Sequence, residues 1–306
     1  MNNPIERNVF DLRHIDGYFT RVATWDPADA IPSPWATLNR HCGGFGGGHG
    51  FAPGWYVVLG GSTGAGKSLA ALNIAKHALL HRWPVGFVTL EMSPEQLQTR
   101  LWSMLFGVEV SKIQPGRWYD EREAARLRQM VREALDDWPG ASFRVNERRV
   151  RNLHDMVDLM EAWREEWGVR VFVVDYMQLC RVPDETETHK RIQRVSERVC
   201  DFAHETESLV LGLSQFHSVA RRNKDHPPSV DSLYGGVDLG NDADMALLLD
   251  HSRYEKDAMT PHLARTYLIH GKNREGPLSD DIPILWDYRT LIAREGLPDE
   301  EGVWPE

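Results

Sequence analysis

The chain has few cysteines, no long hydrophobic run and no excess of positive charge. Its three cysteines, Cys42, Cys180 and Cys200, are widely separated. An odd number of widely separated cysteines argues against a disulfide framework and is typical of proteins in a reducing compartment. The apolar runs, such as Ala246 to Leu249, are far shorter than the roughly 20 residues that cross a bilayer. We therefore expect no transmembrane helix and no membrane partner.

The N-terminus and the net charge exclude two further classes. The first residues are polar rather than an apolar stretch that ends in small residues, so no secretion signal is expected and a cytoplasmic location is predicted. The formal net charge is −10, whereas non-specific coating of DNA depends on cationic groups that displace counterions from phosphates. Any contact with nucleic acid must therefore depend on a local cluster of positive charge.

The composition is typical of a globular protein with one large domain, since 42% of its 306 residues are hydrophobic and 26% are charged. Residues 1–50 contain several prolines and a glycine-rich run from Gly43 to Gly48. This pattern predicts an extended arm or linker with a flexible loop, which we expect to pack on a neighbouring subunit. The compact domain is predicted over residues 51–295, and an acidic tail over residues 296–306.

From Trp55 onward, short β-rich runs alternate with longer segments of helical period. This alternation predicts an α/β fold with a mostly parallel sheet and helices on both of its faces. The expected strands are Trp55 to Leu59, Gly86 to Leu90, Ser142 to Val145, Arg170 to Val174, Leu209 to Leu213, Ala246 to Leu249, Arg265 to His270 and Ile282 to Trp286.

The clearest chemical signal is a glycine-rich segment that follows an apolar strand and opens a helix, which is the context of a phosphate-binding P-loop. Its residues are Gly61, Ser62, Thr63, Gly64, Ala65, Gly66, Lys67 and Ser68. Glycines let backbone N–H groups turn toward phosphate oxygens, and the helix N-terminus adds its positive end. Lys67 is expected to reach the β- and γ-phosphates of ATP, and the Ser68 hydroxyl to bind Mg²⁺. A simple glycine-rich turn is the alternative, but the strand and the helix argue against it.

A second signal is the apolar strand Val171 to Val174, which ends in Asp175. An apolar strand that ends in aspartate is common by itself. Combined with a P-loop, it is typical of the strand whose carboxylate holds Mg²⁺. We therefore expect Asp175, together with Ser68, to form the metal site and to hold the hydration shell of Mg²⁺.

Hydrolysis also needs a group that orients or deprotonates the attacking water. Glu91 follows a strand that we expect to lie beside the P-loop strand, and the helix start at Ser93 fixes it at the strand end. A surface carboxylate is the alternative for Glu91. Gln215 ends another buried strand, and its amide is a candidate sensor of the γ-phosphate.

With these residues in place, the chain resembles the C-terminal motor domain of DnaB-type hexameric helicases over about residues 35 to 290. The motifs that carry the resemblance are Pro53-Gly54, Thr89-Leu90-Glu91-Met92-Ser93, Asp175-Tyr176-Met177-Gln178-Leu179, Leu213-Ser214-Gln215, Asn241-Asp242-Ala243-Asp244 and Gly271-Lys272-Asn273-Arg274-Glu275-Gly276-Pro277. The resemblance implies a RecA-like P-loop NTPase fold whose sheet has an antiparallel C-terminal edge.

The same resemblance implies an ATP-dependent replicative DNA helicase motor that moves 5′ to 3′ on single-stranded DNA. In such a motor, a homo-oligomeric, hexameric ring hydrolyses ATP at its subunit interfaces, and a primase or a helicase loader is a candidate partner. Lys272 and Arg274 would project from a sheet edge toward the ATP of the neighbouring subunit, where cations stabilise the charge that develops on phosphate.

The resemblance further implies that two loops hold the DNA at the centre of the ring. Basic residues in the corresponding stretches could neutralise phosphates locally, although each cluster could equally be a solvated surface. The candidate DNA-binding residues are Lys190, Arg191 and Arg194, then Arg221, Arg222 and Lys224, and finally Tyr234 and Gly235.

Two departures from the family pattern stand out. Tyr234-Gly235 occupies the place where the family usually carries an Arg-Glu pair. Residues 1–50 are also too few for the helical N-terminal domain of typical members. A helicase of a phage or plasmid replicon, in a bacterial cell or a phage-infected host, fits this better than a chromosomal one.

Two other functions remain open. A RecA/RadA or KaiC-like ATPase switch would act on a protein or DNA partner without unwinding, and its basic loops would tolerate neutralisation. A decoy that joins a host ring without cycling is a further alternative, against which the complete set Lys67, Ser68, Glu91, Asp175 and Gln215 argues.

Overall fold

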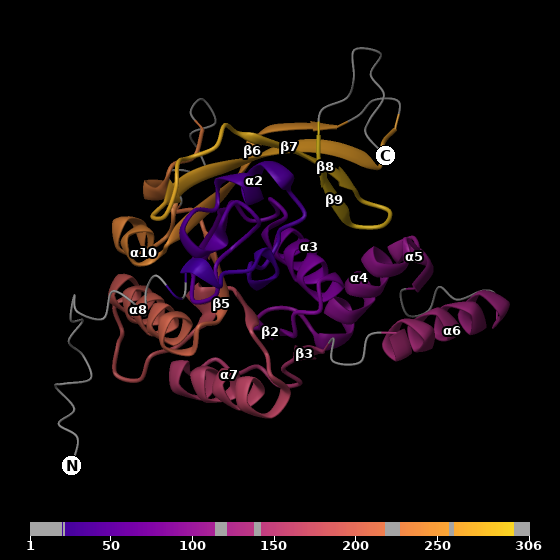
Figure 1. The fold of residues 1–306 in the computed structure, drawn as a ribbon, viewed down its shortest axis with the longest axis horizontal. Coiled ribbons are helices and arrows are strands. Elements are labelled where there is room, and N and C mark those ends of the chain that lie inside the picture. Colours follow the sequence, from indigo (N-terminus) through magenta and orange to yellow (C-terminus); the bar gives the residue numbers. More distant parts are fainter. Residues whose placement is uncertain are drawn as a thin grey trace.

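The structure is a computed structural model, and it describes residue 20 and residues 22–113, 121–137, 142–217, 227–256 and 260–296. The described residues form one nine-stranded sheet with helices on both faces (Figure 1). In sheet order the strands are β3 (Phe143–Val145), β2 (Val85–Thr89), β4 (Val171–Asp175), β5 (Leu209–Gln215), β1 (Tyr56–Gly61), β6 (Met245–Lys256), β7 (Leu263–Asn273), β8 (Ile282–Asp287) and β9 (Ile292–Glu295).

Strand direction divides the sheet into two parts. Neighbours from β3 to β6 pair in parallel, and neighbours from β6 to β9 pair antiparallel. The predicted mostly parallel sheet with an antiparallel C-terminal edge is therefore confirmed. All eight expected strands are present, and β9 is an additional strand that the sequence pattern did not reveal.

The central strands are buried on both faces, because helices cover each side. Along β1, Val57 and Leu59 point into one hydrophobic cluster, whereas Tyr56 and Val58 point into the other. The first cluster is closed by α2 (Ala36–His41), α3 (Lys67–Leu80) and α4 (Pro94–Phe106), with α5 (Val110–Ile113) packed on α4. The second is closed by α7 (Leu153–Trp167), α8 (Thr188–Thr206) and α10 (Gly236–Asp242), while α6 (Glu121–Asp137) precedes β3 in the chain.

Residues 30–52 pack into the core rather than forming the flexible segment that their proline and glycine content predicts. Ile31, Trp35 and Leu38 have no exposed surface, and Ile31 forms an antiparallel bridge with Phe51. Burial of these apolar side chains outweighs the local flexibility of the segment. Residues 1–19 and 21 lie outside the described residues, as does most of the acidic tail, at 297–306. The packing of an arm on a neighbouring subunit therefore stays a prediction.

One predicted neighbour relation is wrong. The sequence predicts that the strand before Glu91 lies beside the P-loop strand, but β4 and β5 separate β2 from β1. The two edges of β1 are already taken by β5 and β6, so the connection through α3 carries the chain past two strand positions before β2. Within the described ranges, no helix combines the length and the apolar character needed to cross a membrane.

Candidate functional site

The P-loop lies between the end of β1 at Gly61 and the start of α3 at Lys67. Gly64 and Gly66 have φ angles of +79° and +91°, a left-handed conformation that residues with a Cβ rarely adopt. Gly66 is the N-cap of α3, and the first amides of a helix have no partner within the helix itself. This arrangement is a cradle for an anion.

Lys67 lies inside this cradle. Its ammonium donates to the carbonyl oxygens of Gly61 and Ser62, both at 2.9 Å, and the residue is only 8% exposed. A phosphate group held by the loop amides would therefore meet a positive charge that is already in place.

Asp175 ends β4 and is buried next to the start of α3. Burial raises the pKa of Asp175 to about 6, while the hydrogen bond that the Ser68 hydroxyl donates acts in the opposite direction. The second carboxylate oxygen, Oδ2, has no hydrogen-bond partner in the described part of the chain. A buried carboxylate oxygen beside a serine hydroxyl is a donor set that suits Mg²⁺, which uses few protein ligands and takes the rest from phosphates and water.

Glu91 lies at the same edge of the sheet as Asp175. Thr89 pairs with Asp175 in the sheet, the Leu90 amide donates to the Asp175 carbonyl at 2.7 Å, and Glu91 follows on the exposed surface. The capping box of Ser93 and Gln96 begins α4 as the sequence predicts. Glu91 is thus near the metal candidates although its strand is not beside β1.

Arg100 is a residue that the sequence reasoning missed. It lies two turns into α4, and although burial lowers the pKa of Arg100, the charges of Asp175 and Glu91 act to raise it. A cation therefore faces both carboxylates from within the same subunit. The available signal was the position of Arg100 on the helix that begins directly after Glu91.

Gln215 lies beside the P-loop at the end of β5. It is paired with Gly61 in the sheet, and the Thr63 hydroxyl donates to its side-chain oxygen at 3.4 Å. Its backbone carbonyl accepts from the amide of Tyr234 at 2.7 Å. Gln178, whose role the sequence reasoning also missed, donates to the Ser214 hydroxyl at 2.7 Å and so joins the ends of β4 and β5.

Lys272 and Arg274 lie at the other end of the sheet. Met245 pairs with Val57 near the start of β1 and with Asn273 at the end of β7. The P-loop begins at the far end of β1, at Gly61, which lies four residues beyond Val57 and so roughly 13 Å further along the strand at about 3.3 Å per residue. The structure therefore does not bring these two cations to the P-loop of their own subunit.

Both cations are held by groups of their own chain. The Arg274 guanidinium donates to Asp244 Oδ1 at 2.7 Å and to the Asn241 carbonyl at 2.9 Å. The Lys272 ammonium donates to backbone carbonyls at the end of α10. His204 Nε2 lies 3.0 Å from Asp244 Oδ2, and its hydrogen bond to Asp244 raises the pKa of His204 to about 10.

The candidate DNA-binding residues fall into three groups. Lys190, Arg191 and Arg194 lie in the first turns of α8, not in the loop that the resemblance implies, because Ile192, Val195 and Val199 form a helical stripe that is buried. Gly235 lies against this helix, since a Cβ at Gly235 would come within 2.9 Å of Ile192, and Tyr234 before it is exposed. The third group, Arg221, Arg222 and Lys224, lies outside the described residues.

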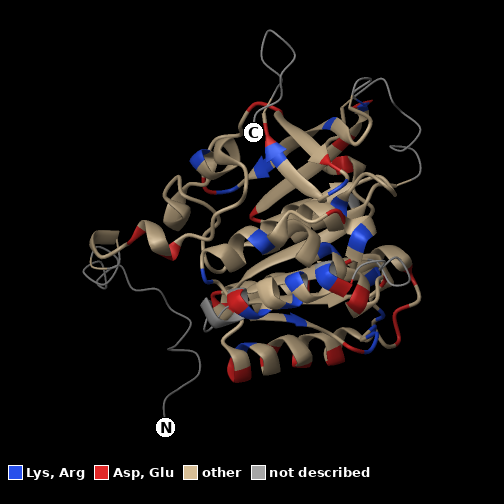
Figure 2. Ribbon diagram, turned by 90° about the vertical axis from the view of Figure 1, so that its right-hand side faces the viewer, with Lys and Arg blue, Asp and Glu red and all other residues tan. Residues whose placement is uncertain are grey.

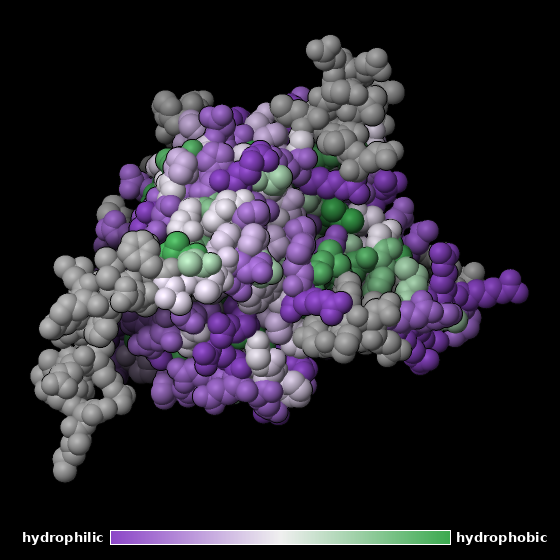
Figure 3. Space-filling model, in the orientation of Figure 1, coloured by the Kyte–Doolittle hydropathy of each residue, from purple (hydrophilic) through white to green (hydrophobic). Residues whose placement is uncertain are grey.

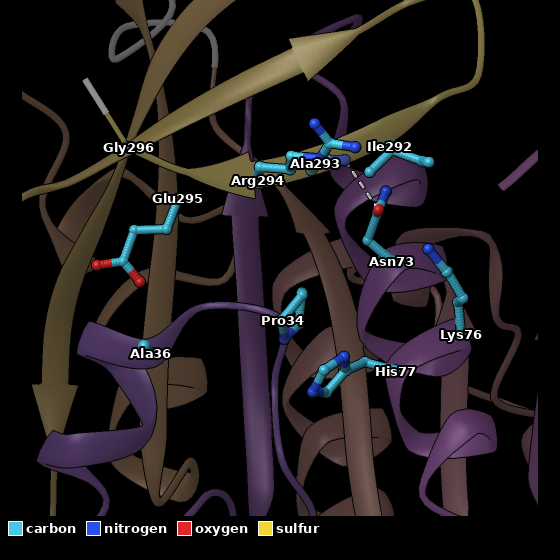
Figure 4. A pocket seen from close by; sticks show the side chains of 10 residues that line it. All are labelled: Pro34, Ala36, Asn73, Lys76, His77, Ile292, Ala293, Arg294, Glu295 and Gly296. Carbon is cyan, nitrogen blue, oxygen red and sulfur yellow. Dashed lines mark hydrogen bonds between the residues drawn. The ribbon is translucent and has the colours of Figure 1, made fainter. Parts of the chain in front are cut away.

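A cavity of about 510 Å³ lies away from these residues (Figure 4). It is lined by Asn73, Lys76 and His77 of α3, by β9 and by the segment at Pro34. The Asn73 side chain connects α3 to β9 there. It donates a hydrogen bond to the Leu291 carbonyl and accepts one from the Ala293 amide. No P-loop residue lines this cavity, so we do not assign nucleotide binding to it.

The family model of the DnaB-like helicase C terminal domain matches residues 35–291. The chain belongs to this family. The DnaB-like domain is 26% identical over 270 residues to a probable plasmid replicative DNA helicase of Chlamydia psittaci, covering 88% of this chain and 56% of that protein. It is 27% identical over 239 residues to the replicative DNA helicase DnaB of Buchnera aphidicola subsp. Baizongia pistaciae, covering 75% and 49%.

Two solved structures share the fold of the DnaB-like domain. One of them, an isolated ATPase domain, superposes with a TM-score of 0.76 at 19% identity and covers 94% of this chain and 98% of that one. The other, a DnaB-like replicative helicase solved for its interactions with primase, superposes with a TM-score of 0.75 at 18% identity and covers 94% and 67%. These likenesses confirm the predicted RecA-like fold. The chain spans about half the length of the curated relatives it matches.

Proposed function

We propose that the DnaB-like domain is the ATP-hydrolysing motor of a replicative DNA helicase that moves on single-stranded DNA as a ring. The observation that carries this proposal is the separation of the P-loop from Arg274 across the length of β1. A subunit with its phosphate site at one end and a cationic finger at the other can complete a catalytic centre only with a neighbour.

Within one subunit, the P-loop amides and Lys67 bind the phosphates of ATP. Ser68 and Asp175 would hold Mg²⁺, which neutralises negative charge on the phosphates when it is bound. Glu91 orients or deprotonates the attacking water, and Arg100 keeps positive charge beside both carboxylates. Gln215 detects whether the γ-phosphate is present. Because the backbone carbonyl of Gln215 accepts a hydrogen bond from the Tyr234 amide, a movement of Gln215 is passed to the segment that begins at Tyr234.

Across the interface, Arg274 approaches the phosphates of the neighbouring subunit. Its guanidinium has five N–H groups, of which Asp244 and Asn241 accept two, and its side chain is 43% exposed. Arg274 therefore still has N–H donors on an exposed guanidinium with which it could bind a phosphate group. Such a finger makes hydrolysis depend on assembly, and a hexamer is the ring size that the family resemblance implies.

An apolar area on the surface supports assembly. Figure 3 shows it over α4 and α5, where Leu105, Phe106, Val108 and Val110 are partly exposed. Contiguous apolar surface of this kind is typical of protein interfaces. A relative whose structure was solved for its interactions with primase makes a primase a candidate partner of this domain as well.

DNA would be held by local positive charge. Basic and acidic positions are interspersed along the ribbon in Figure 2, and α7 at the bottom of that view contains several acidic residues, of which Asp155, Asp158, Glu165 and Glu166 are exposed. Lys190, Arg191, Arg194 and Tyr234 lie on the side where α8 meets α10, which is the surface we assign to the DNA. Movement from 5′ to 3′ follows from the family resemblance.

One observation favours an ATPase switch that does not unwind DNA. Two of the described candidate cations are already near acidic groups of their own chain, with Lys190 at 2.9 Å from Glu187 and Arg194 at 3.8 Å from Glu185. If these pairs persist, the surface offers little charge to a phosphate backbone. The net charge of −10 points the same way.

Steady-state ATP hydrolysis with and without single-stranded DNA distinguishes the two functions, provided that mass is measured on the same samples. A helicase motor is expected to form a ring-sized assembly whose hydrolysis is stimulated by DNA. Hydrolysis that is indifferent to DNA would overturn the motor and favour the switch. Lys67→Ala, which removes the P-loop cation, provides the background rate.

A further inference from the structure

A group of arginines without acidic partners follows β3 and continues past the end of β4. Its members are exposed or half-buried, and they are Arg148, Arg149, Arg151, Arg181 and Arg191. Within the described residues, no ion pair joins any of them to a carboxylate. In a chain whose net charge is −10, such a local excess of positive charge is what contact with nucleic acid requires.

Contacts of the backbone bring these arginines together. Asn146 holds the start of the segment against the end of β2, because its side chain exchanges hydrogen bonds with the backbone of Thr89 at 2.7 and 2.8 Å. Further along, Arg181 forms a parallel bridge with Asn152, and its carbonyl accepts from the Leu153 amide at 2.9 Å. The arginines that follow β3 therefore lie side by side with the one that follows β4.

Two hydrogen bonds place the ends of the group. The Arg149 guanidinium donates to the carbonyl of Glu91 at 3.3 Å, beside the candidate for activating water. The Arg191 guanidinium, at the start of α8, donates to the carbonyl of Gln178 at 3.3 Å. The five arginines, called the arginine strip below, therefore extend from Glu91 to the side of α8 that we assign to the DNA.

An exposed aromatic side chain lies at the α8 end of the arginine strip. Tyr234 is 38% exposed, and its carbonyl accepts from the side chain of Gln178 at 3.4 Å. Gln178 is also the residue whose backbone carbonyl is bound by Arg191. Proteins bind single strands with cationic groups that follow the phosphates and aromatic rings on which bases stack. This combination favours a single-stranded nucleic acid over an acidic peptide.

The arginine strip differs in charge balance from two other candidates for DNA contact. Lys190 lies 2.9 Å from Glu187, and Arg194 lies 3.8 Å from Glu185, so each must give up an acidic neighbour before it meets a phosphate. The arginine strip gives up no such pair. Its guanidinium groups repel one another, and phosphates placed between them relieve that repulsion.

We propose that the arginine strip binds the phosphate backbone of single-stranded DNA, and that the segment after β3 is thereby part of the DNA-binding surface. This inference rests on the proposed function, because it extends the DNA contact of that motor. Guanidinium groups bind phosphate oxygens with paired N–H donors, so the strip holds a strand without reading its sequence. Since Arg149 also donates to the Glu91 carbonyl, a strand bound there lies next to the segment that carries the candidate for activating water.

Fluorescence anisotropy with a labelled oligodeoxythymidine tests the proposal on the full chain, with Mg²⁺ and a non-hydrolysable ATP analogue present. Arg148→Gln combined with Arg149→Gln should weaken binding about tenfold or more, and should lower the slope of log K against log salt by about 0.7 for each arginine removed. Arg148→Lys combined with Arg149→Lys keeps both charges and should keep the slope. Arg126→Gln combined with Arg132→Gln removes the same charge from α6, which lies at the opposite side of Figure 1 from α8, and should bind as the wild type does.

Mass measured on the same samples separates a DNA contact from a contact between subunits. If the arginine strip instead pairs with an acidic surface of a neighbouring copy, the double Gln variant will assemble poorly while its assembled fraction binds DNA normally, and that result would overturn the proposal. Unchanged affinity and slope in a fully assembled double Gln variant would overturn the strip alone and leave the motor standing. Absence of DNA binding by the wild type would overturn the proposed function together with the strip.

The double Gln variant is expected to fold, because the side chains of Arg148 and Arg149 are both exposed. A Tm equal to that of the α6 control variant checks this. If the double variant does not fold, Arg148→Gln alone takes its place, with a slope change of about 0.7 expected. An unchanged slope in that single variant would also overturn the proposal.

Discussion

Complementation between two inactive variants should show that each catalytic centre is shared by two subunits. Arg274→Ala keeps its P-loop but loses its finger, and Lys67→Ala keeps its finger but loses the P-loop cation. Because Lys67 follows one end of β1 and Arg274 lies near the level of the other end, roughly 13 Å or more away along the strand direction, neither variant can repair its own site. Loss of an arginine finger lowers kcat by about 10³ to 10⁵, so each variant alone should hydrolyse ATP near background.

In an equimolar mixed ring, about half of the P-loops are intact and about half of the adjacent fingers are intact, so about one quarter of the interfaces are complete. Hydrolysis by the mixture should therefore approach one quarter of the wild-type rate. The assay is steady-state phosphate release after the two variants are mixed and reassembled, with mass confirming mixed assemblies. A mixture that assembles yet stays at background would refute the shared site, as would full hydrolysis by Arg274→Ala alone.

Three further changes test separate parts of the structure. Asp175→Asn should bind nucleotide but lose Mg²⁺-dependent hydrolysis, because a neutral amide holds the cation poorly; near-normal turnover at saturating Mg²⁺ would remove Asp175 from the metal site. His204→Gln should lower Tm most below pH 6.5 and progressively less as the pH approaches 10, because the Asp244 hydrogen bond raises the pKa of His204 to about 10 and the stabilisation is lost when the ring loses its proton. A Tm difference that stays constant over this range would argue against the pair. Gly60→Ala should lower the free energy of unfolding in urea by about 1–3 kcal/mol, because its Cβ would lie 2.4 Å from Leu233; unchanged stability would show that Leu233 can move aside.

The parts of the site that depend on neighbouring residues in the chain could be predicted from the sequence. The P-loop from Gly61 to Ser68 needs one strand, one turn and one helix in succession, and the capping box at Ser93 needs four consecutive residues. Asp175 was recognisable because an apolar strand ends there. Each of these signals is local, so periodicity and spacing were sufficient.

The parts that depend on strand order could not be predicted in this way. Whether Glu91 meets Asp175 is decided by the pairing of β2 with β4, and the sequence pattern placed β2 beside β1 instead. The partners of Arg274 and Lys272 lie about 30 residues away, at the end of α10. Residues 30–52 were misjudged because glycine and proline indicate local flexibility but say nothing of the burial of Trp35 or Phe51.

Strand displacement from a forked duplex tests the motor most directly. The protein should separate the strands only with ATP and a single-stranded 5′ tail, and Lys67→Ala should separate none. A protein that forms rings and hydrolyses ATP in response to DNA, yet displaces no strand from any fork, would contradict the helicase motor.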